Sequence, residues 1–276
     1  MLRGRLNLSK AGSPRLRVEA MSDAPLKVWL EHEGQLLRLR LNRPKANIVD
    51  AAMIAALREA LTDHLGAANL KAVILDAEGS HFSFGASVEE HLPGQCDEML
   101  KGLHGLVIQM LEAPVPILVA IQGQCLGGGL EVACAGNLLF VAPDAALGQP
   151  EIKLAVFAPA ASCLLPERMG LAAAEDLLYS GRSISGEEAV RSGLANVVNQ
   201  NPAEAAHDYF QKHLQPHSAS TLRLAVKAAR EEFVIRTKAK IVRVEELYLS
   251  GLMATHDAVE GLNAFMEKRP ANWENR

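Results

Sequence analysis

The sequence predicts an α/β fold, in which a largely parallel β-sheet with helices between its strands is followed by a helical carboxyl-terminal region. Short, almost entirely apolar runs, typical of strands buried on both faces, alternate with amphipathic helical patterns over residues 70–145. From residue 158 to the end the pattern is almost wholly helical. Aromatic residues make up only 4% of the chain, a composition that suits close helix packing better than an all-β sandwich.

The first predicted elements are a β-hairpin and a helix. Residues 28–30 and 37–41 flank a turn-like segment, and in the second run leucines alternate with Arg38 and Arg40. This alternation is typical of a half-buried strand. Asp50 then stands where an N-cap would begin an amphipathic helix over residues 51–65.

The remaining elements follow in a regular order. A glycine-rich stretch comes directly after the second buried strand and leads into an apolar helix. Near the end, Asp257 and Glu260 have the spacing of a capping box for a final helix. Buried strands are predicted at 71–77, 114–123 and 138–143, and helices at 96–112 and 130–136.

Composition excludes several classes of function. A net charge of −4 with 22% charged residues indicates no nucleic-acid surface. No apolar run approaches the roughly 20 residues that cross a membrane. The four cysteines are widely spaced, so reduced thiols are expected and a disulfide or zinc site is not. The nine histidines lack metal-like spacing, and no metal site is predicted.

Two glycine-containing turns are candidates for anion binding. Residues 123–129 lie at a strand-to-helix turn, where free backbone N–H groups and the helix dipole favour negative charge. Residues 82–91 follow the preceding buried strand. If the two turns lie side by side, two N–H donors could form an oxyanion hole for a carbonyl oxygen. Alternatively, the glycines only permit close packing and the second turn is an ordinary loop.

Two glutamates are candidates for acid–base chemistry. Glu131 lies within an apolar helical pattern, and Glu151 follows Gly-Gln-Pro in a short loop. A carboxylate among apolar neighbours must be paired, hydrogen-bonded or shifted in pKa if it is buried. Two carboxylates in different environments can divide the acid and base roles. The alternative is that Glu131 lies on a solvated face and Glu151 caps a turn.

Five separate stretches, in the same order, resemble the enoyl-CoA hydratase/isomerase (crotonase) family. They are LNRPKAN (41–47), HFSFGASVEE (81–90), GQCLGGGLEVACAGNLLFVAP (123–143), LGQPEIKL (147–154) and AVEGLNAFMEKR (258–269). The resemblance covers about residues 26–276 and is much more specific than a single motif.

The resemblance implies an architecture. Residues 21–200 would form a crotonase-like spiral of β-β-α units, and residues 201–276 a helical region that assembles a homotrimer or a dimer of trimers. Residues 1–20 carry several basic residues, one acid and no apolar secretion core. They are expected to be a disordered extension, although a targeting peptide is the alternative. The location implied is the cytoplasm.

The resemblance also implies the site. The backbone N–H groups of Ala86 and Gly128 would bind the carbonyl oxygen of an acyl-CoA thioester, and Glu131 and Glu151 would hold the attacking water. Other family members place CoA-binding residues at positions that match Lys45, Phe265 and Lys268, in some cases across a subunit boundary. No cofactor is implied, because coenzyme A arrives as part of the substrate.

Departures from the family pattern point to the acyl group. Residues 156–162 read VFAPAAS where hydratases commonly carry a glycine-rich segment, Phe84 replaces a usual alanine, and Ser87 stands where aspartate is frequent. The resemblance implies that Phe84, Phe157 and Pro159 line the acyl pocket. They resemble the branch that hydrates cyclohexa-1,5-diene-1-carbonyl-CoA to 6-hydroxycyclohex-1-ene-1-carbonyl-CoA.

Two alternatives remain open. One is a general 2-enoyl-CoA hydratase of fatty-acid β-oxidation, or one that acts on cyclic monoenoyl-CoA. The other is a non-catalytic binding protein on the same fold. The sequence determines neither which glutamate is the acid nor whether the assembly is a trimer or a hexamer.

Overall fold

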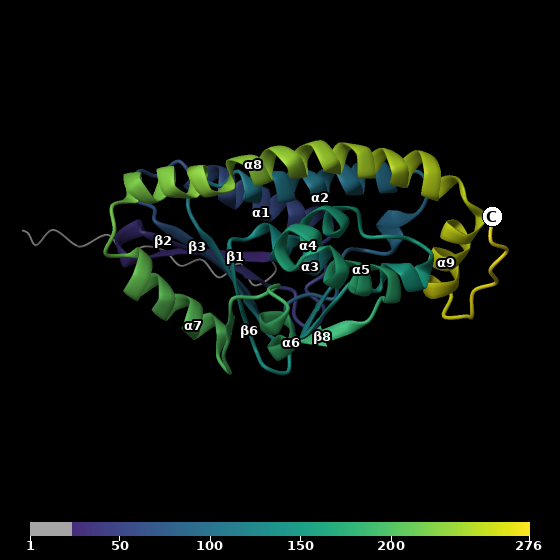
Figure 1. Cartoon of the computed structure of the whole chain (residues 1–276), viewed down its shortest axis with the longest axis horizontal. Coiled ribbons are helices and arrows are strands. Elements are labelled where there is room, and N and C mark those ends of the chain that lie inside the picture. Colours follow the sequence, from purple (N-terminus) through teal and green to yellow (C-terminus); the bar gives the residue numbers. More distant parts are fainter. Residues whose placement is uncertain (1–23) are drawn as a thin grey trace, which may run out of the picture.

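The computed structural model describes residues 24–276, and its frame is a six-stranded sheet (Figure 1). The expected extension at residues 1–20 lies outside this range. Strands β1 and β2 pair antiparallel, and all the others are parallel, which confirms the predicted α/β fold. The strand order is β1 (Leu26–Glu31), β2 (Leu36–Leu41), β3 (Ala72–Ala77), β4 (Ile117–Ile121), β6 (Leu138–Val141) and β9 (Val197–Val198).

A second, three-stranded sheet corrects the expectation that the glycine stretch follows β4 directly. Residues 124–126 of that stretch form strand β5, and a strand of three residues is too short to show a period-two pattern. The turn that follows β3 is bonded to β5, since Leu126 N–H donates to Ser83 O at 3.0 Å. The order of this sheet is β5 (Gln124–Leu126), β7 (Ala146–Gly148) and β8 (Ser183–Ser185).

Helices pack on the larger sheet, and the long α8 extends along most of the molecule, across α2 and α4 (Figure 1). Among residues 24–276, no helix is both long and apolar enough to span a bilayer. The α-helices are α1 (Ala51–His64), α2 (Cys96–Leu111), α3 (Gly128–Ala135), α4 (Pro159–Met169), α5 (Leu171–Ser180), α6 (Gly186–Arg191), α7 (Pro202–Tyr209), α8 (Ala219–Glu246) and α9 (His256–Met266). Shorter 3₁₀ and π segments are η1 (His32–Gly34), η2 (Glu89–His91), η3 (Pro150–Leu154), η4 (Phe210–Leu214), η5 (Leu247–Gly251) and η6 (Leu252–Ala254).

One of the two predicted caps is confirmed and the other is wrong. The Asp50 carboxylate accepts a hydrogen bond from Met53 N–H and begins α1. At the start of α9 the cap is Thr255, whose hydroxyl accepts from Ala258 N–H. Asp257 instead accepts from two N–H groups of the carboxyl-terminal tail, and Glu260 binds Arg269. These carboxylates therefore hold the tail, a long-range contact that local spacing does not reveal.

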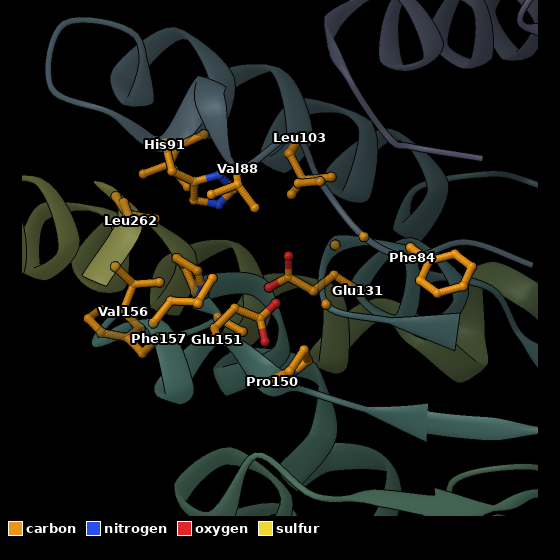
Figure 2. Close-up of a pocket in the computed structure, with 18 residues that line it drawn as sticks. Phe84, Val88, His91, Leu103, Glu131, Pro150, Glu151, Val156, Phe157 and Leu262 are labelled. Carbon is orange, nitrogen blue, oxygen red and sulfur yellow. The ribbon is translucent and has the colours of Figure 1, made fainter. Parts of the chain in front are cut away.

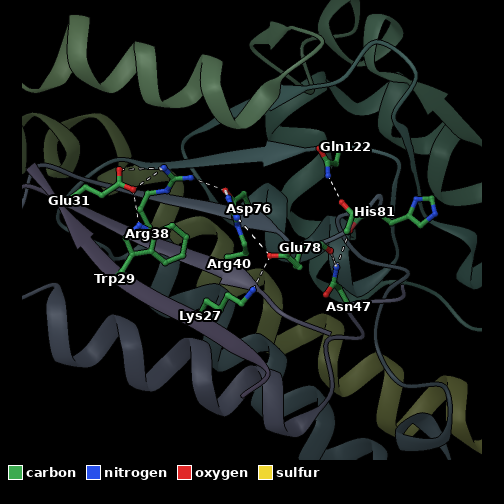
Figure 3. A network of polar contacts seen from close by, with 11 residues as sticks. Lys27, Trp29, Glu31, Arg38, Arg40, Asn47, Asp76, Glu78, His81 and Gln122 are labelled. Carbon is green, nitrogen blue, oxygen red and sulfur yellow. Dashed lines mark hydrogen bonds and ion pairs between the residues drawn. The ribbon is translucent and has the colours of Figure 1, made fainter. Parts of the chain in front are cut away.

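The polar face of β2 is more covered than its alternation predicts. Arg38 is only 7% exposed, because Asp76 on β3 accepts from it at 2.9 Å and Trp29 lies against its guanidinium (Figure 3). Arg40 donates to the same carboxylate at 2.6 Å and stays partly exposed. The prediction that the arginine face of this strand is exposed is thus correct for Arg40 and wrong for Arg38. Leu37, Leu39 and Leu41 face the main core, and Leu36 packs in a second cluster on the other face.

Candidate active site

A narrow cavity of about 70 Å³ opens between the two glycine-containing turns, η3 and the start of α4 (Figure 2). Its walls are mostly apolar, and the two glutamates project into it from neighbouring elements. Long-range folding therefore joins segments that are widely separated in the sequence. The lining residues used below are Phe84, Ala86, Val88, His91, Leu103, Gly128, Glu131, Glu151, Phe157, Pro159 and Leu262.

Two free backbone amides, those of Ala86 and Gly128, meet at this cavity. A β-carbon built on Gly128 would lie 3.0 Å from Ala86 N, and one built on Gly85 would lie 3.6 Å from Gly128 N. Within residues 24–276 neither N–H donates a hydrogen bond to the protein. Two adjacent, unpaired donors are the arrangement that binds an oxyanion.

Glycine is required in each of the two turns that carry these amides. Gly85 and Gly127 have φ values of +113° and +51°, in the region that side chains disfavour. In addition, a β-carbon on Gly127 would lie 2.6 Å from Glu151 Oε1. The alternative that these glycines only permit close packing is thus correct in part. The absence of a side chain on Gly127 lets the Glu151 carboxylate lie against the turn that carries the Gly128 amide.

Glu131 is buried, with 3% of its surface exposed. The alternative that it lies on a solvated face of the helix is therefore wrong. It stands in the first turn of α3, and its Oε1 accepts a hydrogen bond from Ala161 N–H at 2.8 Å. Burial raises the pKa of Glu131, while the Ala161 N–H and the nearby His104 oppose the rise. The carboxylate lies against the amino end of α4, where a negative charge is favoured.

His104 is a contributor that sequence reasoning missed. It lies on α2, is 2% exposed, and its Nδ1 is 2.5 Å from Glu245 Oε2 on α8. It is also one of the groups that lower the pKa of Glu131. No local signal could identify this residue, because its partners come from α3 and α8.

Glu151 is set in a different environment from Glu131. It stands in η3 beside the buried Gln149, whose amide nitrogen, when turned toward the carboxylate, lies 3.1 Å from Oε1 and 3.0 Å from Oε2. Burial, and then the negative charge of Glu131, raise the pKa of Glu151 to about 8. A pKa near 8 favours a proton on Glu151 at neutral pH, whereas Glu131 has the Ala161 N–H at the amino end of α4 directed at its carboxylate.

The three residues expected in the acyl pocket all line the cavity, in different ways. Phe157 packs edge-on against Tyr248, with ring centroids 5.2 Å apart, and Pro159 is buried at the start of α4. The Phe84 ring is 43% exposed and lies at the rim against His81, pointing away from the two glutamates (Figure 2).

Other lining residues escaped the sequence analysis. Val88, Leu103 and Leu262 are apolar, and nothing in their local pattern distinguishes a pocket wall from a core position. His91 lies across the cavity from the glutamates (Figure 2). Its Nδ1 is 2.7 Å from Ser87 O, and burial lowers the pKa of His91.

The three residues expected to bind CoA are not brought together within one chain. Lys45 is exposed in a hollow next to the oxyanion turn, where Phe84 N–H donates to Ala46 O at 2.9 Å. Phe265 and Lys268 are exposed at the end of α9 and do not line the cavity. Their roles in binding CoA stay predictions.

Comparison with protein families gives one match that spans most of the chain. The model described as "Enoyl-CoA hydratase/isomerase" matches residues 31–276. A cyclohexa-1,5-dienecarbonyl-CoA hydratase of Thauera aromatica is 69% identical over 258 residues, covering 93% of this chain and all of that protein. A probable enoyl-CoA hydratase of Bacillus subtilis is 33% identical, covering 84% of this chain and 92% of the other.

Solved structures show the same fold. An enoyl-CoA hydratase from Mycobacterium avium subsp. paratuberculosis superposes with a TM-score of 0.80 at 23% identity, covering 91% of this chain and 99% of the other. An enoyl-CoA hydratase from Bacillus halodurans gives a TM-score of 0.80 at 21% identity, covering 87% and 99%. At 21–23% identity, the similarity to these two structures shows a shared fold and no more.

Proposed function

The chain belongs to the enoyl-CoA hydratase/isomerase family, and we propose that it adds water to cyclohexa-1,5-diene-1-carbonyl-CoA, giving 6-hydroxycyclohex-1-ene-1-carbonyl-CoA. The observation that carries the proposal is the arrangement at one cavity of two glutamates and two free, adjacent amides. The choice of substrate rests on the 69% identity to the Thauera aromatica hydratase.

The thioester carbonyl docks with its oxygen between Ala86 N–H and Gly128 N–H. This placement polarises the conjugated system and aligns the carbon β to the carbonyl with the carboxylates. The helix that begins at Gly128 adds the positive end of its dipole. Loss of one such donor typically costs about 3–4 kcal/mol of transition-state stabilisation.

Water then attacks the β carbon while Glu131 accepts one of its protons. The environment of Glu131 supports this role, because the Ala161 N–H and His104 favour its anion. The electron pair of the carbon–carbon double bond moves through the carbonyl carbon onto the thioester oxygen. The resulting dienolate is stabilised by the two amides.

Glu151 next delivers its proton to the far end of the dienolate, which completes a 1,4-addition. A pKa of about 8 means that this carboxyl group carries the proton at neutral pH and can release it to carbon. A proton shift from Glu131 to Glu151 restores the starting state. The reaction is redox-neutral, so CoA enters only as part of the substrate, and neither a metal nor a redox cofactor is required for it.

We also propose a homotrimer, or a dimer of trimers, working in the cytoplasm. The exposed side chains of Leu224, Ile235 and Val242 on α8 support assembly, because large apolar residues gathered on one helix favour an interface. Such an assembly would also supply a route for Phe265 and Lys268 to reach a neighbouring site. Sedimentation or light scattering of the purified protein tests the oligomeric state.

The experiment for the proposed reaction compares acyl groups on the purified full-length protein. The protein is incubated separately with cyclohexa-1,5-diene-1-carbonyl-CoA, cyclohex-1-ene-1-carbonyl-CoA and crotonyl-CoA. The masses of the products are then measured by mass spectrometry. The dienoyl ester should gain one water with the highest kcat/KM. In D₂O the deuterium should lie at the distal carbon, para to the new hydroxyl.

Two outcomes would redirect the proposal. A higher kcat/KM for crotonyl-CoA would favour the general 2-enoyl-CoA hydratase. Failure to hydrate any ester, together with retention on immobilised nucleic acid at moderate salt, would favour the non-catalytic binding protein.

A further inference from the structure

Two histidines and one glutamate meet where the β1–β2 hairpin contacts α7, away from the cavity. The Nε2 atoms of His32 and His207 are 3.0 Å apart, and His207 Nε2 is 3.6 Å from Glu31 Oε2. One ligand atom from each of the three residues lies within 4.8 Å of the others. We propose that Glu31, His32 and His207 bind a divalent transition-metal cation, specifically Zn²⁺, which ties the hairpin to α7.

The distances fit a shared metal centre. Zinc binds imidazole nitrogen and carboxylate oxygen at about 2.0–2.2 Å, and tetrahedral angles then place two ligand atoms about 3.3 Å apart. The two measured separations, 3.0 and 3.6 Å, bracket this value. Without metal, a single N–H···N hydrogen bond joins the two imidazoles, and the cation takes the place of that proton.

The backbone brings neighbouring residues to the same side of the hairpin. Successive side chains of a strand point to opposite faces, so Glu31 and His32 would normally diverge. His32 has a φ of +51° and Glu33 a φ of +57°, which breaks the alternation just after β1. His207 then approaches from the last turn of α7, and the buried Phe210 packs against the His32 ring with centroids 5.2 Å apart.

Surrounding groups orient the three ligands. Trp29 Nε1 donates to Glu31 Oε1 at 2.7 Å, so Oε2 is the oxygen nearer to the imidazoles (Figure 3). Arg38 lies 3.4 Å from Glu31, but its shorter bond, 2.9 Å, is to Asp76. Gln215 Nε2 lies 3.4 Å from His32 Nδ1, and rotation of this amide would present its oxygen to the ring N–H of a metal-bound imidazole.

The ligand set selects the ion. Two imidazoles and one carboxylate suit Zn²⁺, and also Ni²⁺ or Cu²⁺, whereas Mg²⁺ and Ca²⁺ prefer oxygen ligands. Three protein ligands leave a fourth position for water. The cluster lies where the parallel strands begin, since Glu31 pairs with Leu36, and the oxyanion turns follow the opposite ends of those strands. The site therefore stands apart from the proposed hydration chemistry.

The test is zinc binding by the full-length protein after chelator treatment. Zn²⁺ is titrated by calorimetry and by competition with a chromophoric chelator, and thermal unfolding is followed with and without ZnCl₂. We expect one Zn²⁺ per chain at this site and a rise in Tm with zinc. His207→Ala and His32→Ala should each weaken zinc binding at least tenfold and abolish the rise in Tm.

A matched control is His213→Ala, because His213 follows α7 on the same helical stretch, is exposed and does not contact the cluster. It should bind zinc as the parent does. If His207→Ala does not fold, His207→Gln and Glu31→Gln provide the same comparison. Undiminished zinc affinity in the folded His207 variant, or no zinc binding by the parent at micromolar concentration, would overturn the site. Equal stabilisation by Mg²⁺ would also count against it.

Discussion

The carboxylate of Glu131 accepts a hydrogen bond from the backbone N–H of Ala161, 2.8 Å away, at the amino end of α4. This bond distinguishes Glu131 from Glu151, whose pKa is raised to about 8 by burial and by the charge of Glu131. Two chemically identical side chains are thereby given different proton affinities. The asymmetry is the physical basis on which we propose Glu131 as the base and Glu151 as the acid.

Replacing either carboxylate with its amide should abolish most of the turnover. Glu131→Gln removes the proton acceptor and Glu151→Gln removes the transferable proton, so each should lower kcat by at least about 10²-fold. Binding of the CoA ester should change little, because the amide keeps the size of the side chain. Steady-state kinetics and calorimetry measure both quantities. Glu187→Gln, on an exposed face, is the control, and near-parental turnover of Glu131→Gln would remove that residue from the mechanism.

Turnover should fall as the pH rises through about 8. The acid form of Glu151 is the active one, and its raised pKa keeps that form populated up to about pH 8. Above this pH the proton is lost, so kcat declines on the alkaline side rather than near the pKa of an ordinary glutamate. A pH profile of kcat measured at saturating substrate reports this limb. A flat profile from pH 6 to pH 10 would contradict the role of Glu151 as the acid.

Adding a methyl group at Gly128 should damage catalysis specifically. A β-carbon there would lie 3.0 Å from both Ala86 N and Ala86 Cβ, so the two amides would be forced apart. Gly128→Ala should therefore reduce kcat by roughly 10²-fold, the cost of losing one oxyanion donor. Gly66→Ala is the matched control, since no atom lies within 4 Å of the added carbon. Equal kcat in the two variants would show that the Gly128 amide does not bind the thioester oxygen.

Removing the imidazole of His104 should shift the acidic limb of the pH profile. His104 lowers the pKa of Glu131, so His104→Gln should raise that pKa, and the anion needed as base would form only at higher pH. The midpoint of the acidic limb of kcat should move upward relative to the parent. His213→Gln should leave it in place. An unchanged midpoint in a folded His104 variant would mean that Glu131 is tuned by other groups.

The elements with strong local patterns were predictable. Five-residue and six-residue apolar strands, the amphipathic α1 and α2, and the Asp50 cap all follow from nearest-neighbour rules. The glutamates and glycines of the site were found because their residue types are unusual in apolar surroundings. Strand β5 was not found, because three residues are too few to show a period-two pattern. The cap at Thr255 was not found, because Asp257 and Glu260 show a competing capping-box spacing next to it.

The sequence by itself determined most of the strands and helices of the larger sheet, the two candidate glutamates and the two glycine-containing turns, because periodicity and residue chemistry are local properties. Only the tertiary structure decided which groups act on each other. It placed Ala161 and His104 beside Glu131, kept Phe265 away from the cavity of its own chain, and joined Glu31 and His32 to His207. Distances and burial depend on contacts between distant segments, and these contacts set the proton affinity of the two glutamates and the geometry of the proposed zinc site.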